Sequence, residues 1–358
     1  MESPGSLTLC VHIIPEFIEL LLLSFSMGVL VCHIIFAKAD GAGAPPLDLA
    51  SRIWRCFAIA ATVMTLASIG DLLARTAEMS GVPLAQVFGL LPTVIAHAHL
   101  GHLWLIRIAA LLLLAVSAWA GGRFRGPRGV PYLMLGVVLV IAMTRSATGH
   151  AADSGDFSIP ELVDWLHLDA VLVWGGGVFA LALAIFPGLI KTGDQAAPLL
   201  AEIAARFSRI AGLATAVIAL TAVYNAVVYA GSLAALVKTP YGAIMIAKAF
   251  LFILLILLGA INRYLFIPVM AEWAGHPATK SGVLRSLAGR CFNRPGAHVT
   301  GRPAAGRFNN CLRLEALLMA MVLFCSTMLR HEVPARHFLH AQQGQISGGH
   351  DHEHKTGE

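Results

Sequence analysis

Two apolar runs, YLMLGVVLVIAMT at 132–144 and LDAVLVWGGGVFALALAIF at 168–186, flank the polar stretch GHAADSGDFSIPELVDWLH at 149–167. A helix needs about 20 mostly apolar residues to cross a bilayer; the second run has 19, and the first is the core of a mostly apolar segment over 130–149. The polar stretch contains no lysine or arginine, but it holds two histidines and four acids: His150, His167, Asp153, Asp156, Glu161 and Asp164. The pattern predicts two antiparallel transmembrane helices joined by a turn of imidazoles and carboxylates.

The composition of the whole chain supports this interpretation. Of 358 residues, 57% are hydrophobic and only 13% are charged, and the mean hydropathy is +0.75. Soluble domains carry about 25% charged residues, so we expect an all-α integral membrane protein. The net charge of +5 then reflects membrane topology, and no nucleic-acid partner is expected. Six scattered cysteines without a CxxC pair predict neither a disulfide framework nor a thiol metal motif.

Eight segments have the length and apolarity of transmembrane helices. They lie near 14–37, 53–74, 102–120, 130–149, 162–187, 208–230, 241–268 and 312–330. A shorter stretch at 83–99, interrupted by Pro92, is expected to be interfacial or re-entrant. We therefore predict an eight-span membrane domain over 1–340, followed by a disordered, His-rich tail over 341–358.

The basic residues orient the bundle, because cytoplasmic loops are enriched in lysine and arginine. The odd-numbered connections carry clusters such as Arg123, Arg125 and Arg128, whereas the even-numbered connections carry only Arg75 and Lys238. The odd connections are therefore expected in the cytoplasm and both termini in the periplasm. No cleaved signal peptide is expected, because no basic segment precedes the first apolar run.

With this orientation, histidines accumulate at the outer face. Only His33, His276 and His298, of 15 in the chain, fall on the cytoplasmic side. Neutral imidazole is the commonest metal ligand, so we predict an outer transition-metal site, although a single histidine at an interface is equally well explained as an amphipathic side chain. The predicted ligands are His150 and His167 at the centre, one or more of His97, His99 and His102 to close the site, and Met143 one step deeper.

Other residues are predicted to support or extend this site. Ionisable groups inside transmembrane helices are functional candidates, and Asp164, which shares a helix face with His167, is a candidate to orient that imidazole. The further candidates are Lys248, Glu315 and a soft-ligand stripe of Met321, Cys325 and Met328, with His350, His352 and His354 as an accessory collector in the tail. Two features have a structural interpretation: Asp71 and Arg75 are expected to pair, and WGGGVF at 174–179 is expected to allow close helix packing.

Several stretches resemble, in order, the signatures of the copper resistance D family of bacterial inner-membrane proteins. They are LGHLWLIRIAALLLL, GHAAD, LVDWLHLDAVLVWGGGVFAL, TPYGAIMIAKAFLFILLILLGAINRYLFIP and LRLEALLMAMVLF, and they span about 97–330. Eight residues fall on family-like positions: His150, His167, Tyr241, Gly242, Lys248, Asn262, Arg263 and Glu315. The resemblance implies an eight-span copper transport protein of the inner membrane, with a small periplasmic partner of the copper resistance C type.

The predicted function is therefore copper uptake across the inner membrane, serving copper homeostasis or resistance. The chain has no GxxxxGK[ST] loop and no CPC triplet, so we expect neither an enzyme nor an ATP-driven pump. Two alternatives remain open at this stage. One is a b-type cytochrome, in which His150 and His167 would ligate haem. The other is a membrane copper sensor or assembly factor that binds copper without transporting it.

Overall fold

The computed structural model describes residues 6–37, 46–121, 129–149, 151–152, 155–230, 233–275 and 302–332. Every element in these ranges is a helix. Seven helices are long and apolar enough to cross a membrane: Ile13–Phe36, Leu47–Ser80, His99–Ala120, Ile159–Thr192, Asp194–Tyr229, Pro240–Trp273 and Pro303–His331. This confirms the prediction of an all-α, multi-span membrane protein.

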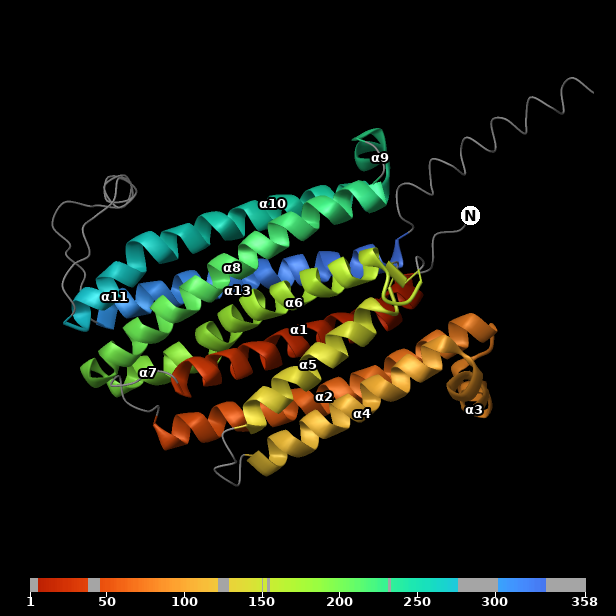
Figure 1. The fold of residues 1–358 in the computed structure, drawn as a ribbon, viewed down its shortest axis with the longest axis horizontal. Coiled ribbons are helices and arrows are strands. Elements are labelled where there is room, and N and C mark those ends of the chain that lie inside the picture. The colour runs from red at the N-terminus through yellow and green to blue at the C-terminus, as the bar shows by residue number, and fades with distance from the viewer. Residues whose placement is uncertain are drawn as a thin grey trace, which may run out of the picture.

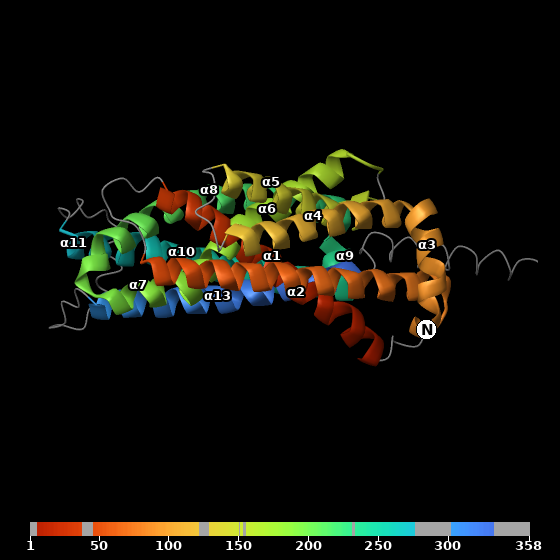
Figure 2. The same ribbon diagram turned by 90° about the horizontal axis from the view of Figure 1, so that it is seen from below.

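The eighth predicted span, 130–149, corresponds to α5 (Val130–Ser146), which has only 17 residues. At 1.5 Å per residue, it is about 26 Å long, slightly less than the apolar thickness of a bilayer. The predicted interfacial segment at 83–99 forms a short 3-10 turn (Leu84–Gln86) and α3 (Val87–His97). This helix lies across the ends of α2 (Leu47–Ser80) and α4 (His99–Gly121), as Figures 1 and 2 show.

The two ends of the described bundle lie on the same side. Glu16, near the start of α1 (Ser6–Ala37), forms an ion pair with Arg330 at the end of α13 (Arg302–His331), with 3.7 Å between Nε and Oε1. Figure 1 shows the same arrangement, which agrees with an even number of crossings. The periplasmic location of this end remains a prediction from the loop charges, and it is called the outer end below.

The centre of the bundle is the crossing of α1 with α6 (Ile159–Ala180), which continues through a π-helical segment (Leu181–Ile185) into α7 (Phe186–Thr192). A Cβ atom on Gly28 would lie 1.8 Å from the carbonyl oxygen of Gly176, and one on Gly176 would lie 1.8 Å from that of Ser24. The two backbones are therefore in direct contact. This geometry confirms that the glycines of WGGGVF serve close helix packing.

Gly176→Ala is expected to destabilise the bundle, because the added methyl group would overlap a backbone carbonyl that cannot rotate away. Overpacking a core typically costs about 1–3 kcal/mol. The measurement is thermal unfolding of the purified protein in detergent. Gly136→Ala in α5 is the matched control, since nothing lies within 4 Å of its added Cβ, and it should leave the midpoint unchanged or slightly higher. Equal midpoints for the two variants would contradict the packing argument.

Candidate functional site

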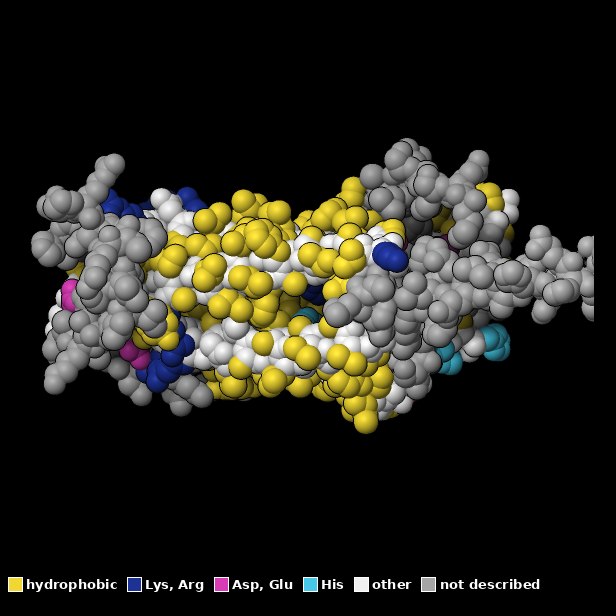
Figure 3. Space-filling view, turned by 90° about the horizontal axis from the view of Figure 1, so that it is seen from above, with side chains coloured by type: hydrophobic (Ala, Val, Ile, Leu, Met, Phe, Trp, Pro, Cys, Tyr) yellow, Lys and Arg dark blue, Asp and Glu magenta, His cyan; other side chains and the backbone are white. Residues whose placement is uncertain are grey.

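A cavity of about 330 Å³ lies within the outer half of the bundle. Its walls come mainly from α6, α13, α8 (Ala197–Ala230) and α10 (Pro240–Ile261). It forms because α8 packs on α6 whereas α10 packs on α13, which leaves space between the two pairs. Figure 3 shows this region as a hollow in an apolar face, with a Lys or Arg side chain and a histidine visible inside.

His167 of α6 lines this cavity together with Lys248 of α10. Each side chain lies eight residues from the outer end of its helix, about 12 Å along the axis. Asp164, one turn earlier on α6, is on the same wall. The structure therefore brings three of the predicted residues, His167, Asp164 and Lys248, to one cavity.

The His167 ring is held by Thr221 of α8, with 2.8 Å between Nδ1 and Oγ1. The Thr221 hydroxyl donates its single hydrogen within its own helix, to the carbonyl oxygen of Val217 at 2.7 Å. It therefore accepts from His167, so that Nδ1 carries a proton. Within the described residues, Nε2 has no hydrogen-bond partner, and in the neutral imidazole, the form that binds metals, Nε2 carries the lone pair.

The orienting partner of His167 thus differs from the expected one. Asp164 Oδ2 accepts a hydrogen bond from the Ser146 hydroxyl at 2.7 Å, and Thr221 occupies the position at Nδ1. The Asp164 carboxylate connects α6 to α5 and contributes negative charge to the cavity wall. Thr221 is 54 residues from His167 in the sequence and lies on another helix. Its hydroxyl also bonds to its own helix backbone, as most threonines in transmembrane helices do, so the sequence did not indicate its contact with His167.

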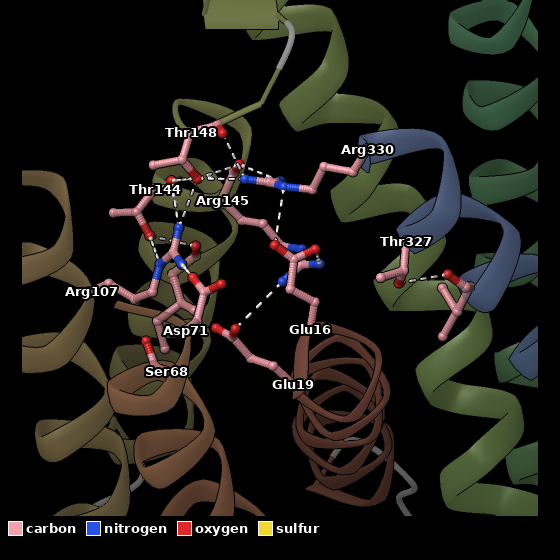
Figure 4. A network of polar contacts seen from close by, with 12 residues as sticks. Glu16, Glu19, Ser68, Asp71, Arg107, Thr144, Arg145, Thr148, Thr327 and Arg330 are labelled. Carbon is pink, nitrogen blue, oxygen red and sulfur yellow. Dashed lines mark hydrogen bonds and ion pairs between the residues drawn. The ribbon is translucent and has the colours of Figure 1, made fainter. Parts of the chain in front are cut away.

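A buried ionic network borders the cavity at the outer end (Figure 4). Glu16 and Glu19 of α1 are each 1% exposed. Arg145 of α5 contacts both, with nitrogen–oxygen distances of 3.7 and 3.5 Å, and Arg330 donates to the carbonyl oxygens of Arg145 and Thr148 at 3.0 and 2.8 Å. Since Arg145 and Arg330 also line the cavity, the network forms part of its wall.

The network extends to α2 and α4 on the other side of α1. Arg75 contacts Glu16 and, as predicted, pairs with Asp71, with 2.9 Å between Nε and Oδ1. Arg107 of α4 lies 3.8 Å from Asp71 and donates to the Thr144 carbonyl at 2.8 Å. Five helices are therefore joined at their outer ends by four guanidinium groups and three carboxylates.

Glu16, Glu19 and Arg330 were not predicted as site residues. The signal was present, because PEFIELLLL at 15–23 places two acids three residues apart at the start of an apolar run, and such acids share a helix face. Two acids on one face of an apolar helix are costly to bury without cationic partners, so this pattern predicts arginines or lysines on neighbouring helices.

The other predicted histidines lie outside the cavity. His97, His99 and His102 are exposed on α3 and α4. His99 lies 3.2 Å from Asp156 and His102 lies 3.2 Å from the Ala96 carbonyl oxygen. Among the described residues, no three His, Cys, Asp or Glu side chains are arranged to hold a metal ion. His150 and the tail histidines His350, His352 and His354 lie outside the described residues.

The predicted sulfur ligands are not on the cavity wall. Met321 is 46% exposed, and Met143, Cys325 and Met328 are partly buried and are not among the lining residues, although Cys325 interacts electrostatically with Lys248 of the cavity wall. The thioethers that do line the cavity belong to Met245 of α10 and Met319 of α13. Glu315 lies one turn below Met319, outside the cavity, where it accepts a hydrogen bond from Asn262 at 2.9 Å.

Comparison with known proteins identifies relatives of both halves of the chain. A family model described as "Copper resistance protein D-like, N-terminal domain" matches 8–158, and one described as "Copper resistance protein D" matches 201–329. "Copper transport protein CutJ" of Bacillus subtilis (strain 168) is 32% identical over 165 residues, 45% of this chain and 30% of that protein. "Copper resistance protein D" of Pseudomonas syringae pv. tomato is 30% identical over 197 residues, 54% of this chain and 62% of that protein.

The matched regions therefore span less than two thirds of either relative. No solved structure matches the chain significantly.

Proposed function

Because the chain belongs to the copper resistance D family, as a multi-pass protein of the inner membrane, we propose that it binds copper in the cavity at the outer end of the bundle and passes the ion toward the cytoplasm. Copper is the transported ion in this proposal, and the cavity is its first binding site inside the membrane. A periplasmic copper-binding protein of the copper resistance C type is the proposed donor.

The observation that carries the proposal is the state of His167. Its Nδ1–H is fixed by Thr221, so Nε2 is the nitrogen with an available lone pair. A ligating histidine almost always donates its other ring N–H to a neighbouring acceptor, which fixes its tautomer and orientation. His167 has this arrangement before any metal arrives.

The sulfur atoms in the cavity favour the cuprous ion. Met245 and Met319 are thioethers on two different helices of the lining, and thioethers select Cu(I) over harder ions. Met319 is 2% exposed and lies at the deep end of the lining on α13. An ion held by His167 would therefore have a soft ligand further along the inward direction.

Four charged side chains line the cavity, and their balance determines how favourably a cation binds there. Lys248, Arg145 and Arg330 repel a cation, whereas Asp164 attracts it. Arg145 and Arg330 are already paired with the acids and carbonyl oxygens of the ionic network, which weakens their repulsion. Lys248 interacts electrostatically with Asp164, so the two charges of the cavity interior partly offset one another.

The proposal is tested by copper binding and uptake with one matched pair of variants. Thr221→Val removes the acceptor for His167 Nδ1 and should weaken Cu(I) binding by about 10–100-fold, as expected for the loss of an outer-shell partner of a ligand. Thr221→Ser keeps the hydroxyl and should bind like the parent. Affinity is measured by competition with a chromogenic Cu(I) chelator, and uptake is measured in reconstituted vesicles.

The outcomes separate the competing functions. Copper binding without uptake into vesicles would favour the sensor or assembly factor. A Soret band in the purified protein would favour a b-type cytochrome, although His167 is the single histidine of the described residues that lines the cavity. If Thr221→Val binds Cu(I) as tightly as Thr221→Ser, the hydrogen bond to His167 does not support copper binding, and the proposal that His167 is a ligand would be contradicted.

A further inference from the structure

A second polar site lies beneath the floor of the cavity, between the inner end of α10 and α13. Glu315 of α13 is 3% exposed and Asn262 is 6% exposed. Asn262 Nδ2 donates to Glu315 Oε1 at 2.9 Å. Glu315 is 16 residues from the outer end of α13, about 24 Å along the helix axis, so the site is deeper than His167 and lies toward the inner side of the membrane.

The Glu315 carboxylate has no cationic partner in the part of the chain that the structure describes. No lysine, arginine or histidine nitrogen of those residues lies within 4.0 Å of it, and the nearby Arg263 donates instead to the Ser208 carbonyl at 3.1 Å. An ionised carboxylate without a partner is costly to bury. Glu315 therefore needs a proton or a bound cation.

The side chains around Glu315 supply further ligand atoms. Asn262 Oδ1 is buried and has no hydrogen-bond partner. Cys311, a free thiol one helical turn before Glu315, interacts with both Asn262 and Glu315. A Cβ atom on Gly259 would lie 3.7 Å from Glu315 Oε1, so the glycine leaves room beside the carboxylate. A thiol and a carboxylate thus lie beside the Asn262 side chain, whose amide oxygen is buried and unpartnered.

Local backbone geometry marks the same place. Asn262 is the first residue of a π-helical segment (Asn262–Phe266), which joins α10 to α11 (Ile267–Trp273). Such segments interrupt the regular hydrogen bonding of a helix and occur frequently at functional sites. Here the interruption places the Asn262 side chain against α13.

One helical turn separates this site from the outer cavity. Met319 is four residues after Glu315 on α13, and Leu255 is four residues before Gly259 on α10; both line the cavity. Four residues of helix correspond to about 6 Å. Met319 is tightly packed, because a Cβ atom on Gly175 of α6 would lie 2.8 Å from its Cγ and 3.0 Å from its Sδ.

We propose that Cys311, Glu315 and Asn262 form an inner copper site, which receives the ion from the cavity through Met319. Binding exchanges one proton for one monovalent cation: Glu315 releases the proton it holds toward the cytoplasmic side and takes up the Cys311 thiol proton as the sulfur coordinates Cu(I), so the net charge of the buried site does not change. The site deepens the proposed function and depends on it. Its residues are distinct from those of the outer cavity, so the two sites can be removed separately.

The test counts Cu(I) equivalents bound to the purified full-length protein in competition with a chromogenic chelator. The parent should bind one equivalent that Cys311→Ser and Glu315→Gln each abolish, and another that His167→Ala abolishes. Full binding by both inner-site variants would overturn the inner site and leave the proposed function intact. If His167→Ala removed no equivalent, the outer site would fail instead, and absence of binding by the parent would overturn both.

A labelling measurement on the parent protein removes any dependence on variant folding. Ag(I), which mimics Cu(I) without redox chemistry, should protect Cys311 from alkylation by a small maleimide, detected by mass spectrometry. Cys56 is exposed on α2 and should be alkylated at the same rate with and without the metal. Equal labelling of Cys311 in both conditions would contradict the proposal.

Discussion

Glu16→Gln is expected to destabilise the protein by about 3–5 kcal/mol, as removal of one partner from a buried ion pair typically does. The Glu16 carboxylate is 1% exposed and interacts with Arg75, Arg145 and Arg330. Glutamine has nearly the same shape but no charge. The guanidinium groups would then outnumber the two remaining carboxylates by four to two, and their mutual repulsion would rise in a region that excludes water.

Thermal unfolding in detergent measures this effect. The matched control is Glu202→Gln, because Glu202 also forms an ion pair, with Arg206 four residues later on the same helix, but its side chain is 35% exposed. Partly exposed pairs of this kind contribute about 0–1 kcal/mol, so the control should unfold close to the parent. Similar midpoints for the two variants would show that the network does not hold the helix ends together.

A second variant tests whether charge balance is the cause. Adding Arg75→Gln to Glu16→Gln removes one positive charge from the same contact. The double variant should be more stable than the sum of the two single effects predicts, since neighbouring charges in one network are not additive. Strict additivity would mean that Glu16 acts through packing alone.

The helices themselves were predictable because each carries its own signal. Seven of the eight apolar segments predicted to cross the bilayer are the seven long helices, and the eighth, 130–149, is the shorter helix α5. The start of α6 was predicted at 162, three residues late, because the Ser158 hydroxyl caps the helix by accepting from the Glu161 amide. Three consecutive glycines predicted a close helix contact on α6, and the structure identifies α1 as the partner.

The arrangement of the site was less predictable, because a helix sequence shows which residues share a face but not which face is turned inward. Met321, Cys325 and Met328 do share a face of α13, yet the cavity is lined by the neighbouring face that carries Met319 and Ser326. The two faces are both largely apolar. Only the packing of α13 against α10 and α6 decides between them.

Contacts between distant segments were equally hidden from the sequence. Thr221 reaches His167 across 54 residues, and Arg330 reaches Arg145 across 185. His167 was predicted because an imidazole beside acids is chemically conspicuous. Thr221 was not, because a threonine in a transmembrane helix usually bonds to its own backbone, and this one does so as well.

His167→Ala is expected to abolish the outer copper site. Loss of an outer-shell partner typically lowers metal affinity by about 10–100-fold, and loss of the ligand itself should lower it at least as much. Copper uptake into reconstituted vesicles should fall to the level of vesicles without protein, because the remaining cavity ligands are two thioethers beside Lys248. The fold should persist, since the imidazole makes one hydrogen bond, to Thr221.

His97→Ala, His99→Ala and His102→Ala are the matched controls. These three histidines were predicted from the sequence to close the same site, but they are exposed on α3 and α4 and do not line the cavity. We therefore expect each variant to retain the affinity and the uptake rate of the parent. If His167→Ala behaves like the parent while one of the three abolishes binding, copper enters at the α3–α4 surface, and the cavity around His167 has another role.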